Sequence, residues 1–120
     1  MDQRKKTGNQ GESIAVEYLI QQGFSIIERN WRCAIGEVDI VAQQAEVLVF
    51  VEVRTRHGQK YGRATESITP TKQQRLIALA ETYLQQHEDY ADSAWRIDVV
   101  AIQLGRHAPQ IEHVENAVGW

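Results

Sequence analysis

Apolar residues recur along the first half of the chain at helical and then at alternating spacing. Asn9 and Glu12 are spaced as an N-cap and its N3 partner, and apolar residues then recur every three or four positions until Gly23 ends the run. Three alternating stretches follow, and together they predict an antiparallel meander of strands. The predicted strands cover residues 24–32, 36–43 and 46–54.

The second half of the chain predicts a helix followed by a long strand. Thr69 and Pro70 read as an N-cap with proline at the first helical position, and 76–84 carries apolar residues at helical spacing. Residues 95–104 alternate as a strand, and 111–114 predicts a short last one. Because a helix between two strands is the layout of a crossover, the third and fourth strands are predicted to be parallel neighbours.

Acidic side chains stand inside two of these apolar strands. Strand parity places Glu37 and Asp39 on one face of the second strand, and Glu52 and Arg54 on one face of the third. A carboxylate among apolar residues is unfavourable unless it is paired, hydrogen-bonded or bound to a cation. A buried ion pair between Glu52 and Arg54 is one explanation, and a bound divalent cation is the other.

The turn between the second and third strands sets which acids face each other. With Gln44 and Ala45 at the tip of a two-residue hairpin, Glu37 lies directly opposite Glu52. A register slipped by two residues places Asp39 opposite Glu52 instead. Either register brings the acids onto one face, within roughly 5 to 8 Å of one another.

Length and composition limit the class of protein. At 120 residues with 42% apolar residues, the chain is expected to form a single domain over residues 1–120. Its longest purely apolar stretch, 47–51, is too short for a membrane helix, and the polar start lacks a signal-peptide core. We therefore expect a cytoplasmic protein without a membrane partner. The lone Cys33 excludes an internal disulfide.

Charge is distributed unevenly along the chain. The net charge of −3 would argue against a nucleic-acid partner, but basic residues gather between positions 54 and 75. The local field of one face decides phosphate binding, so this segment predicts nucleic-acid contacts, with an ordinary solvated surface as the alternative. Tyr61 in the same segment is placed either to stack on an unpaired base or to pack in the core. The basic residues are Arg54, Arg56, Lys60, Arg63, Lys72 and Arg75.

The acids suit a hard cation. Mg²⁺ or Mn²⁺ takes oxygen ligands, which Asp39 and Glu52 would supply, with Glu12 as a third if the first helix packs beside the sheet edge. A metal bound there would activate water and polarise a phosphodiester. Arg54 or Lys72 would then stabilise the developing charge.

A further acid, Asp98, lies in the strand over 95–104. It shares a face with Arg96 and Val100. We expect a structural ion pair with a base carried by a helix rather than a part in catalysis.

A set of short motifs closely resembles the YraN-like family of small bacterial proteins, over nearly the whole chain. The motifs are Gly11-Glu12, Gly23-Phe24, Arg29-Asn30-Trp31-Arg32, Gly36-Glu37-Val38-Asp39-Ile40-Val41, Val49-Phe50-Val51-Glu52-Val53-Arg54-Thr55-Arg56, Tyr61-Gly62 and Lys72.

That family is similar to the restriction-endonuclease-like superfamily, closest to its Holliday-junction-resolvase branch. The resemblance implies an α/β fold with a central mixed sheet flanked by helices. It implies that Asp39 and Glu52 are the two signature acids, and that the backbone carbonyl of Val53 faces the metal. Glu12 matches an additional acid carried by a helix, and Arg54 stands where the superfamily has a lysine.

Arg54 leaves two functions open. Arginine stays protonated, so Arg54 orients phosphate or neutralises charge but is no general base, and Lys72 is the candidate to replace the lysine in space. The first function is a metal-dependent endonuclease for branched or structured DNA. The second is a catalytically degenerate module that keeps the fold and binds nucleic acid or protein. Because resolvase-like enzymes act as dimers, the resemblance also implies a homodimer.

Overall fold

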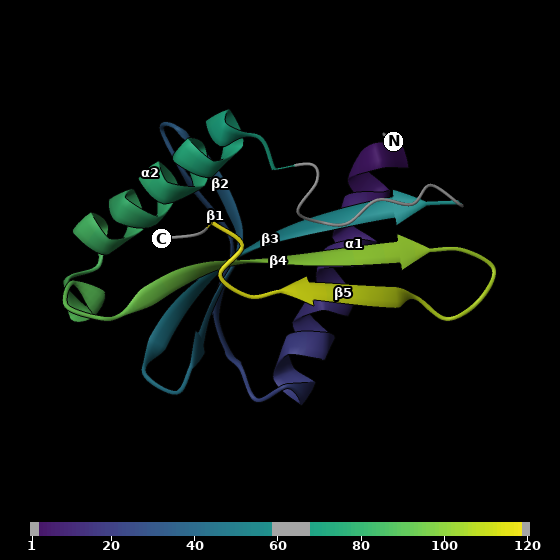
Figure 1. The fold of residues 1–120 in the computed structure, drawn as a ribbon, viewed down its shortest axis with the longest axis horizontal. Coiled ribbons are helices and arrows are strands. Elements are labelled where there is room, and N and C mark those ends of the chain that lie inside the picture. The colour runs from purple at the N-terminus through teal and green to yellow at the C-terminus, as the bar shows by residue number, and fades with distance from the viewer. Residues whose placement is uncertain (1–2, 59–67, 119–120) are drawn as a thin grey trace.

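The computed structural model describes residues 3–58 and 68–118, which form one five-stranded sheet and its helices (Figure 1). Among these residues, no helix is both long and apolar enough to cross a membrane. The helices are α1 (Gln3–Gln21), α2 (Pro70–Gln86) and a short 3₁₀ helix, η2 (Glu88–Tyr90). The strands are β1 (Ser25–Cys33), β2 (Gly36–Gln44), β3 (Val47–His57), β4 (Trp95–Leu104) and β5 (Gln110–Val114).

The sheet is mixed, in the spatial order β1-β2-β3-β4-β5. The first three strands form the predicted antiparallel meander, and β5 runs antiparallel to β4. Between β3 and β4 the chain crosses over through α2, and these two strands are parallel as the crossover requires. The structure thus confirms an α/β fold with a mixed sheet flanked by helices.

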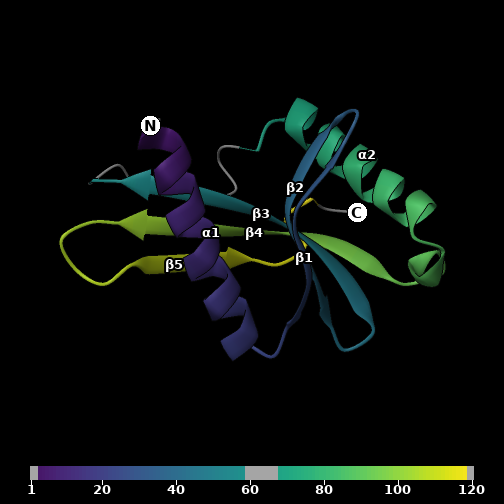
Figure 2. The same ribbon diagram turned by 180° about the vertical axis from the view of Figure 1, so that it is seen from behind.

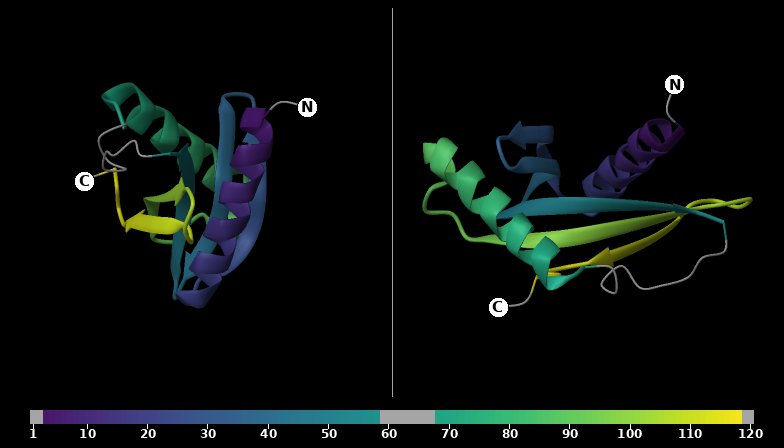
Figure 3. Two further views of the ribbon diagram at one scale, coloured as in Figure 1. Left: turned by 90° about the vertical axis from the view of Figure 1, so that its right-hand side faces the viewer. Right: turned by 90° about the horizontal axis from the view of Figure 1, so that it is seen from above.

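The two helices lie on opposite faces of the sheet. Figure 2 shows α1 crossing the face opposite to the one viewed in Figure 1, and the view from above in Figure 3 separates the two helices. Ala15 and Leu19 of α1 pack on one buried apolar cluster with residues such as Val49 and Val51. Leu79 and Tyr83 of α2 pack on a second cluster. Because both faces are covered, β3 and β4 read as nearly continuous apolar runs.

The ends of the helices agree only partly with the prediction. Thr69 is the N-cap of α2, and its side-chain oxygen accepts a hydrogen bond from the backbone N–H of Lys72 at 3.2 Å. In contrast, α1 begins at Gln3, so the predicted N-cap at Asn9 is wrong. The carboxylate of Glu12 contacts β1 and β2 and is not a capping partner of Asn9.

The hairpin between β2 and β3 has the second of the two predicted registers. Gln44 pairs with Val47, so the tip consists of Ala45 and Glu46 and the first prediction is off by two residues. Ala45 adopts a φ of 53°, the left-handed conformation that tight hairpin turns need. An alanine gives no sign of this conformation in the sequence, which is why the tip was misplaced.

The β2 and β3 strands separate towards the middle of the sheet. Their pairing runs from the hairpin to Ile40 opposite Val51, whereas β2 stays paired with β1 as far as Gly36. The left-hand view of Figure 3 shows the two long strands of the β1 and β2 hairpin standing across the sheet. The edge of β3 beyond Val51 therefore faces an opening, which we call the fork.

Candidate metal centre

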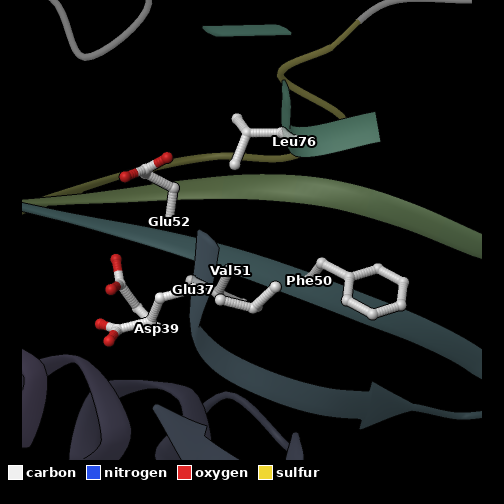
Figure 4. A pocket seen from close by; sticks show the side chains of 7 residues that line it. Glu37, Asp39, Phe50, Val51, Glu52 and Leu76 are labelled. Atoms are coloured by element: carbon white, nitrogen blue, oxygen red, sulfur yellow. The ribbon is translucent and has the colours of Figure 1, made fainter. Parts of the chain in front are cut away.

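Acidic side chains from β2 and β3 point into the fork. A pocket opens there between Leu76 of α2 and the two strands, and Phe50 forms part of its wall. Figure 4 shows that the carboxylates of Glu37, Asp39 and Glu52 turn towards the same side of this pocket. The predicted convergence of acids from two neighbouring strands is confirmed.

Asp39 is held by the backbone of β3. Its Oδ2 accepts a hydrogen bond from the N–H of Val53 at 2.8 Å, which satisfies a donor that faces the fork. The pKa of Asp39 is raised to about 7, chiefly by burial; the charges of Glu52, Glu12 and Glu37 contribute to the increase, and the Val53 hydrogen bond opposes it. A carboxylate in this position is therefore stabilised by any positive charge that reaches it.

Glu12 and Glu37 stand beside Asp39. One carboxylate oxygen from each of the three lies within 4.8 Å of the others. Glu12 Oε2 is buried and accepts no hydrogen bond from the residues that the structure describes. An all-oxygen donor set with an unsatisfied buried oxygen fits a hard divalent cation such as Mg²⁺ or Mn²⁺.

Glu52 faces the same pocket from β3. Asp39 and Glu52 are the first residues beyond Ile40 and Val51, the last pair of the register, and both line the pocket where the strands separate. Burial raises the pKa of Glu52, against the lowering effect of the charges of Arg54, Lys72 and Arg75. The basic residues at the start of α2 therefore act electrostatically on this acid.

The peptide groups of Val53 lie on the side of β3 that faces β2. In a strand, the N–H and C=O of one residue point to the same side. Because the N–H of Val53 points to Asp39, its carbonyl also lies on the edge of β3 that faces the fork.

Two arginines of β1 contact the acids from the outside. Arg32 Nε lies 2.7 Å from Glu37 Oε2, and the two residues are direct cross-strand neighbours. Arg29 Nη2 lies 3.9 Å from Glu12 Oε2 and 3.5 Å from the hydroxyl of Ser13. From the sequence, Glu37 is predicted near the other acids but not among the ligands, and these two arginines have no predicted role. The signal was present, since Glu37 has the same strand parity as Asp39.

The remaining predicted residues are less well placed by the structure. Arg56 is a half-buried residue of β3, which extends three residues beyond the predicted strand end at Arg54. Arg75 is exposed on α2. Lys60, Tyr61 and Arg63 lie outside the described residues.

Asp98 belongs to a separate buried network. Its carboxylate accepts hydrogen bonds from Arg96 at 2.9 and 3.2 Å and from the backbone N–H of Asn116 at 3.0 Å, and lies 2.8 Å from His113 Nε2. His113 Nδ1 in turn lies 3.0 Å from the hydroxyl of Tyr18. The expected structural ion pair exists, but its base is carried by the same strand and not by a helix.

A comparison with solved structures adds one distant likeness. The chain is similar to Pyrococcus furiosus SfsA, solved in complex with Ca²⁺, with a TM-score of 0.41 and 14% sequence identity. The match covers 93% of this chain but only 63% of that longer chain. A likeness of this degree carries no argument about function.

Sequence relatives cover almost the full chain. A UPF0102 protein of Roseiflexus castenholzii is 49% identical over 117 residues, covering 96% of this chain and 94% of its own. A relative in Dehalococcoides mccartyi is 47% identical, covering 97% and 95%, and one in Methylococcus capsulatus is 45% identical, covering 96% and 92%. The model of the uncharacterised protein family UPF0102 matches residues 11–102. The chain therefore belongs to the UPF0102 family, in agreement with its resemblance to the YraN-like family.

Proposed function

We propose that this protein is a metal-dependent endonuclease that hydrolyses phosphodiester bonds in branched or otherwise structured DNA. The observation that carries the proposal is the meeting of two sets of acids at the fork. Glu12, Glu37 and Asp39 offer carboxylate oxygens within 4.8 Å of one another, and Glu52, on which basic residues of α2 act, lines the same pocket as Glu37 and Asp39. Carboxylates at this spacing repel one another, and a cation bound between them would remove this repulsion.

The acidic residues of the fork are the proposed ligands of the cation. Asp39 and Glu52 would hold Mg²⁺ or Mn²⁺, with Glu12 and the Val53 carbonyl as further ligands. The cation, when bound, supplies a water of lowered pKa and polarises the phosphate to be cut. The Val53 N–H keeps Asp39 turned into the fork, which preorganises the site.

Positive side chains border the acids. Lys72 and Arg75 lie on the first turns of α2 and are exposed, so they are accessible to a phosphate backbone. Arg54 adds a permanent positive charge near Glu52. The proposed nucleic-acid surface comprises these three residues together with Arg56, Lys60, Tyr61 and Arg63.

The second function is a catalytically degenerate module that binds nucleic acid or protein without cutting. The observation that favours it is Arg54, which occupies the position of a lysine in the resembling superfamily and cannot accept a proton from water. Lys72 acts on Glu52 from α2 and is the candidate for the missing lysine. Binding is expected of both functions, so cleavage has to separate them.

The test is incubation of the purified protein with four-way, flapped and linear DNA in Mg²⁺ or Mn²⁺. Glu52→Gln is the test variant, and Glu46→Gln is its matched control, since Glu46 is an exposed acid at the tip of the same hairpin. We expect Glu52→Gln to lower the cleavage rate by about 100-fold or more, because a lost metal ligand removes several kcal/mol of transition-state stabilisation. Glu46→Gln should cleave as the wild type does.

Two results would decide against the nuclease. Cleavage that survives Glu52→Gln would remove the site, and wild-type protein that binds Mn²⁺ in calorimetry but cuts none of the three DNAs would favour the degenerate module. For the latter outcome, Lys72→Ala should still weaken DNA binding, because its contact with phosphate does not depend on catalysis.

A further inference from the structure

We infer that Arg29 and Arg32 of β1 form a second phosphate-binding surface that is exposed by cation binding, so that the two arginines exchange a carboxylate partner for a nucleic-acid phosphate. The inference rests on the proposed function, since it assumes a cation and a polyanion at the fork. It assigns a role to β1, which lies outside the predicted site.

The two arginines neutralise the acids that flank Asp39. Arg32 contacts Glu37 at 2.7 Å, and Arg29 approaches Glu12 at 3.9 Å. Glu12 on α1 and Glu37 on β2 are the two members of the acidic cluster besides Asp39. In the protein without a metal, the guanidinium groups therefore supply part of the positive charge that the cluster requires.

The arginines are the exposed members of these ion pairs. The side chain of Arg32 is 74% exposed against 34% for Glu37, and that of Arg29 is 41% exposed against 12% for Glu12. Water solvates both guanidinium groups, and holding a long solvated side chain in one position has an entropic cost that limits the strength of such pairs. A competing divalent cation at the carboxylates therefore meets little resistance from the arginines.

The position of the arginines suits a strand of nucleic acid that crosses the fork. Lys72 and Arg75 of α2 act electrostatically on Glu52, while Arg29 and Arg32 of β1 pair with Glu12 and Glu37 of the acidic cluster. Arginine binds phosphate in a bidentate geometry that remains available once its carboxylate partner binds a metal. A polyanion that enters the fork thus finds positive groups on both sides of the cation.

The experiment compares DNA binding with and without a cation. Affinity for a four-way DNA junction is measured over a range of salt concentrations, in Ca²⁺ and in EDTA, for the wild type, Arg29→Gln and Arg32→Gln. Arg106→Gln is the matched control, because Arg106 is an exposed arginine in the connection between β4 and β5. Arg32→Lys keeps the charge, and thermal unfolding checks that each variant is folded.

In Ca²⁺, each glutamine variant should reduce the slope of log affinity against log salt by about 0.9, the value for one lost phosphate contact in duplex DNA. In EDTA the same variants should match the wild type, and Arg32→Lys and Arg106→Gln should match it in both conditions. Calorimetry with Mn²⁺ should show tighter metal binding by Arg32→Gln, because a competing cation is removed from Glu37.

Other outcomes would overturn the inference. An unchanged slope in Ca²⁺, an equal loss of slope in EDTA, or wild-type protein that binds no DNA in either condition would each do so. The proposed function is judged separately by cleavage. Normal cleavage with unchanged slopes removes only the role of β1, whereas the expected slopes without cleavage support that role and remove the nuclease.

Discussion

At the scale of single residues, Asp39 carries the strongest conflict in the structure. Burial and three neighbouring carboxylates oppose its charge, and a single backbone hydrogen bond from Val53 supports it. The net effect on the pKa of Asp39 is an increase. Since the pKa of Asp39 is raised to about 7 in the folded protein from its ordinary value of 3.8, the folded state holds the proton more tightly than the unfolded state does.

The stability of the metal-free protein should therefore depend on pH through Asp39. The favourable contribution is complete below pH 3.8 and is lost as the pH rises through about 7. Asp39→Asn removes this dependence, so the variant should gain stability over the wild type between pH 5 and pH 8, by up to about 4 kcal/mol. Urea unfolding in EDTA at several pH values measures the difference. A constant difference across that range would show that Asp39 does not titrate there.

At the scale of elements, the approach of α1 to the sheet depends on a residue without a side chain. Gly11 is buried against β3, and a Cβ there would come to 3.0 Å from Thr55 Cβ and would overlap the Thr55 hydroxyl. Glu12 is the next residue of α1. The close packing of Gly11 on β3 therefore also positions the carboxylate of Glu12 at the fork. The helix accepts a poor helix former at this position because the packing requires it.

Gly11→Ala should consequently destabilise the protein, although alanine is the better helix former. The gain in helix propensity is about 1 kcal/mol, whereas overpacking costs roughly 1 to 3 kcal/mol and the nearest atoms belong to a short, branched side chain. Chemical denaturation should show a net loss of stability, together with weaker Mn²⁺ binding as Glu12 shifts. Gly105→Ala is the control, because a Cβ there meets nothing within 4 Å. Equal stability of the two variants would contradict the close approach.

The elements were largely predictable because their signals are local. The pattern of apolar residues predicted both the first and the last residue of β4, and the cap at Thr69 predicted where α2 begins. The start of α1 was not predictable in this way, since the cap-like pair Asn9 and Glu12 lies within a longer helix and Glu12 is used by the fork instead. The hairpin register depended on the left-handed Ala45, which residue type does not reveal.

At the scale of the whole molecule, the sequence indicated which acids meet but not what surrounds them. Parity and pairing bring Asp39 and Glu52 together, and both are local properties of neighbouring strands. The contact of Arg29 with Glu12 depends on how β1 and α1 pack, which no spacing in the chain encodes, whereas Arg32 meets Glu37 across the hairpin of β1 and β2. The same holds for the network around Asp98, in which His113 connects Asp98 to Tyr18 of the distant N-terminal helix.

The Asp98 network joins α1, β2, β4 and β5 through buried polar groups. Arg96 binds both Asp98 and the side chain of Gln44, while His113 connects Asp98 to Tyr18. Burial would raise the pKa of Asp98, but hydrogen bonds from His113, Arg96 and the N–H of Asn116 lower it overall. The carboxylate is therefore charged in the folded protein and every neighbour is oriented towards that charge.

Removing this carboxylate should destabilise the whole fold more than removing the ion pair does. Asp98→Ala removes the nearest carboxylate from Arg96, whose side chain is only 19% exposed, and should cost roughly 3 kcal/mol of unfolding free energy, whereas the double variant Asp98→Leu with Arg96→Met should cost clearly less. Because the pKa of Asp98 is lowered, its contribution is present above pH 3.8 and is lost from the wild type as the pH falls through the folded value, so the losses of both variants relative to the wild type should shrink in acid. Urea unfolding at pH 7 and pH 3 measures the stability losses of both variants. If Asp98→Ala is no less stable than the double variant at pH 7, the ion pair does not hold the four elements together.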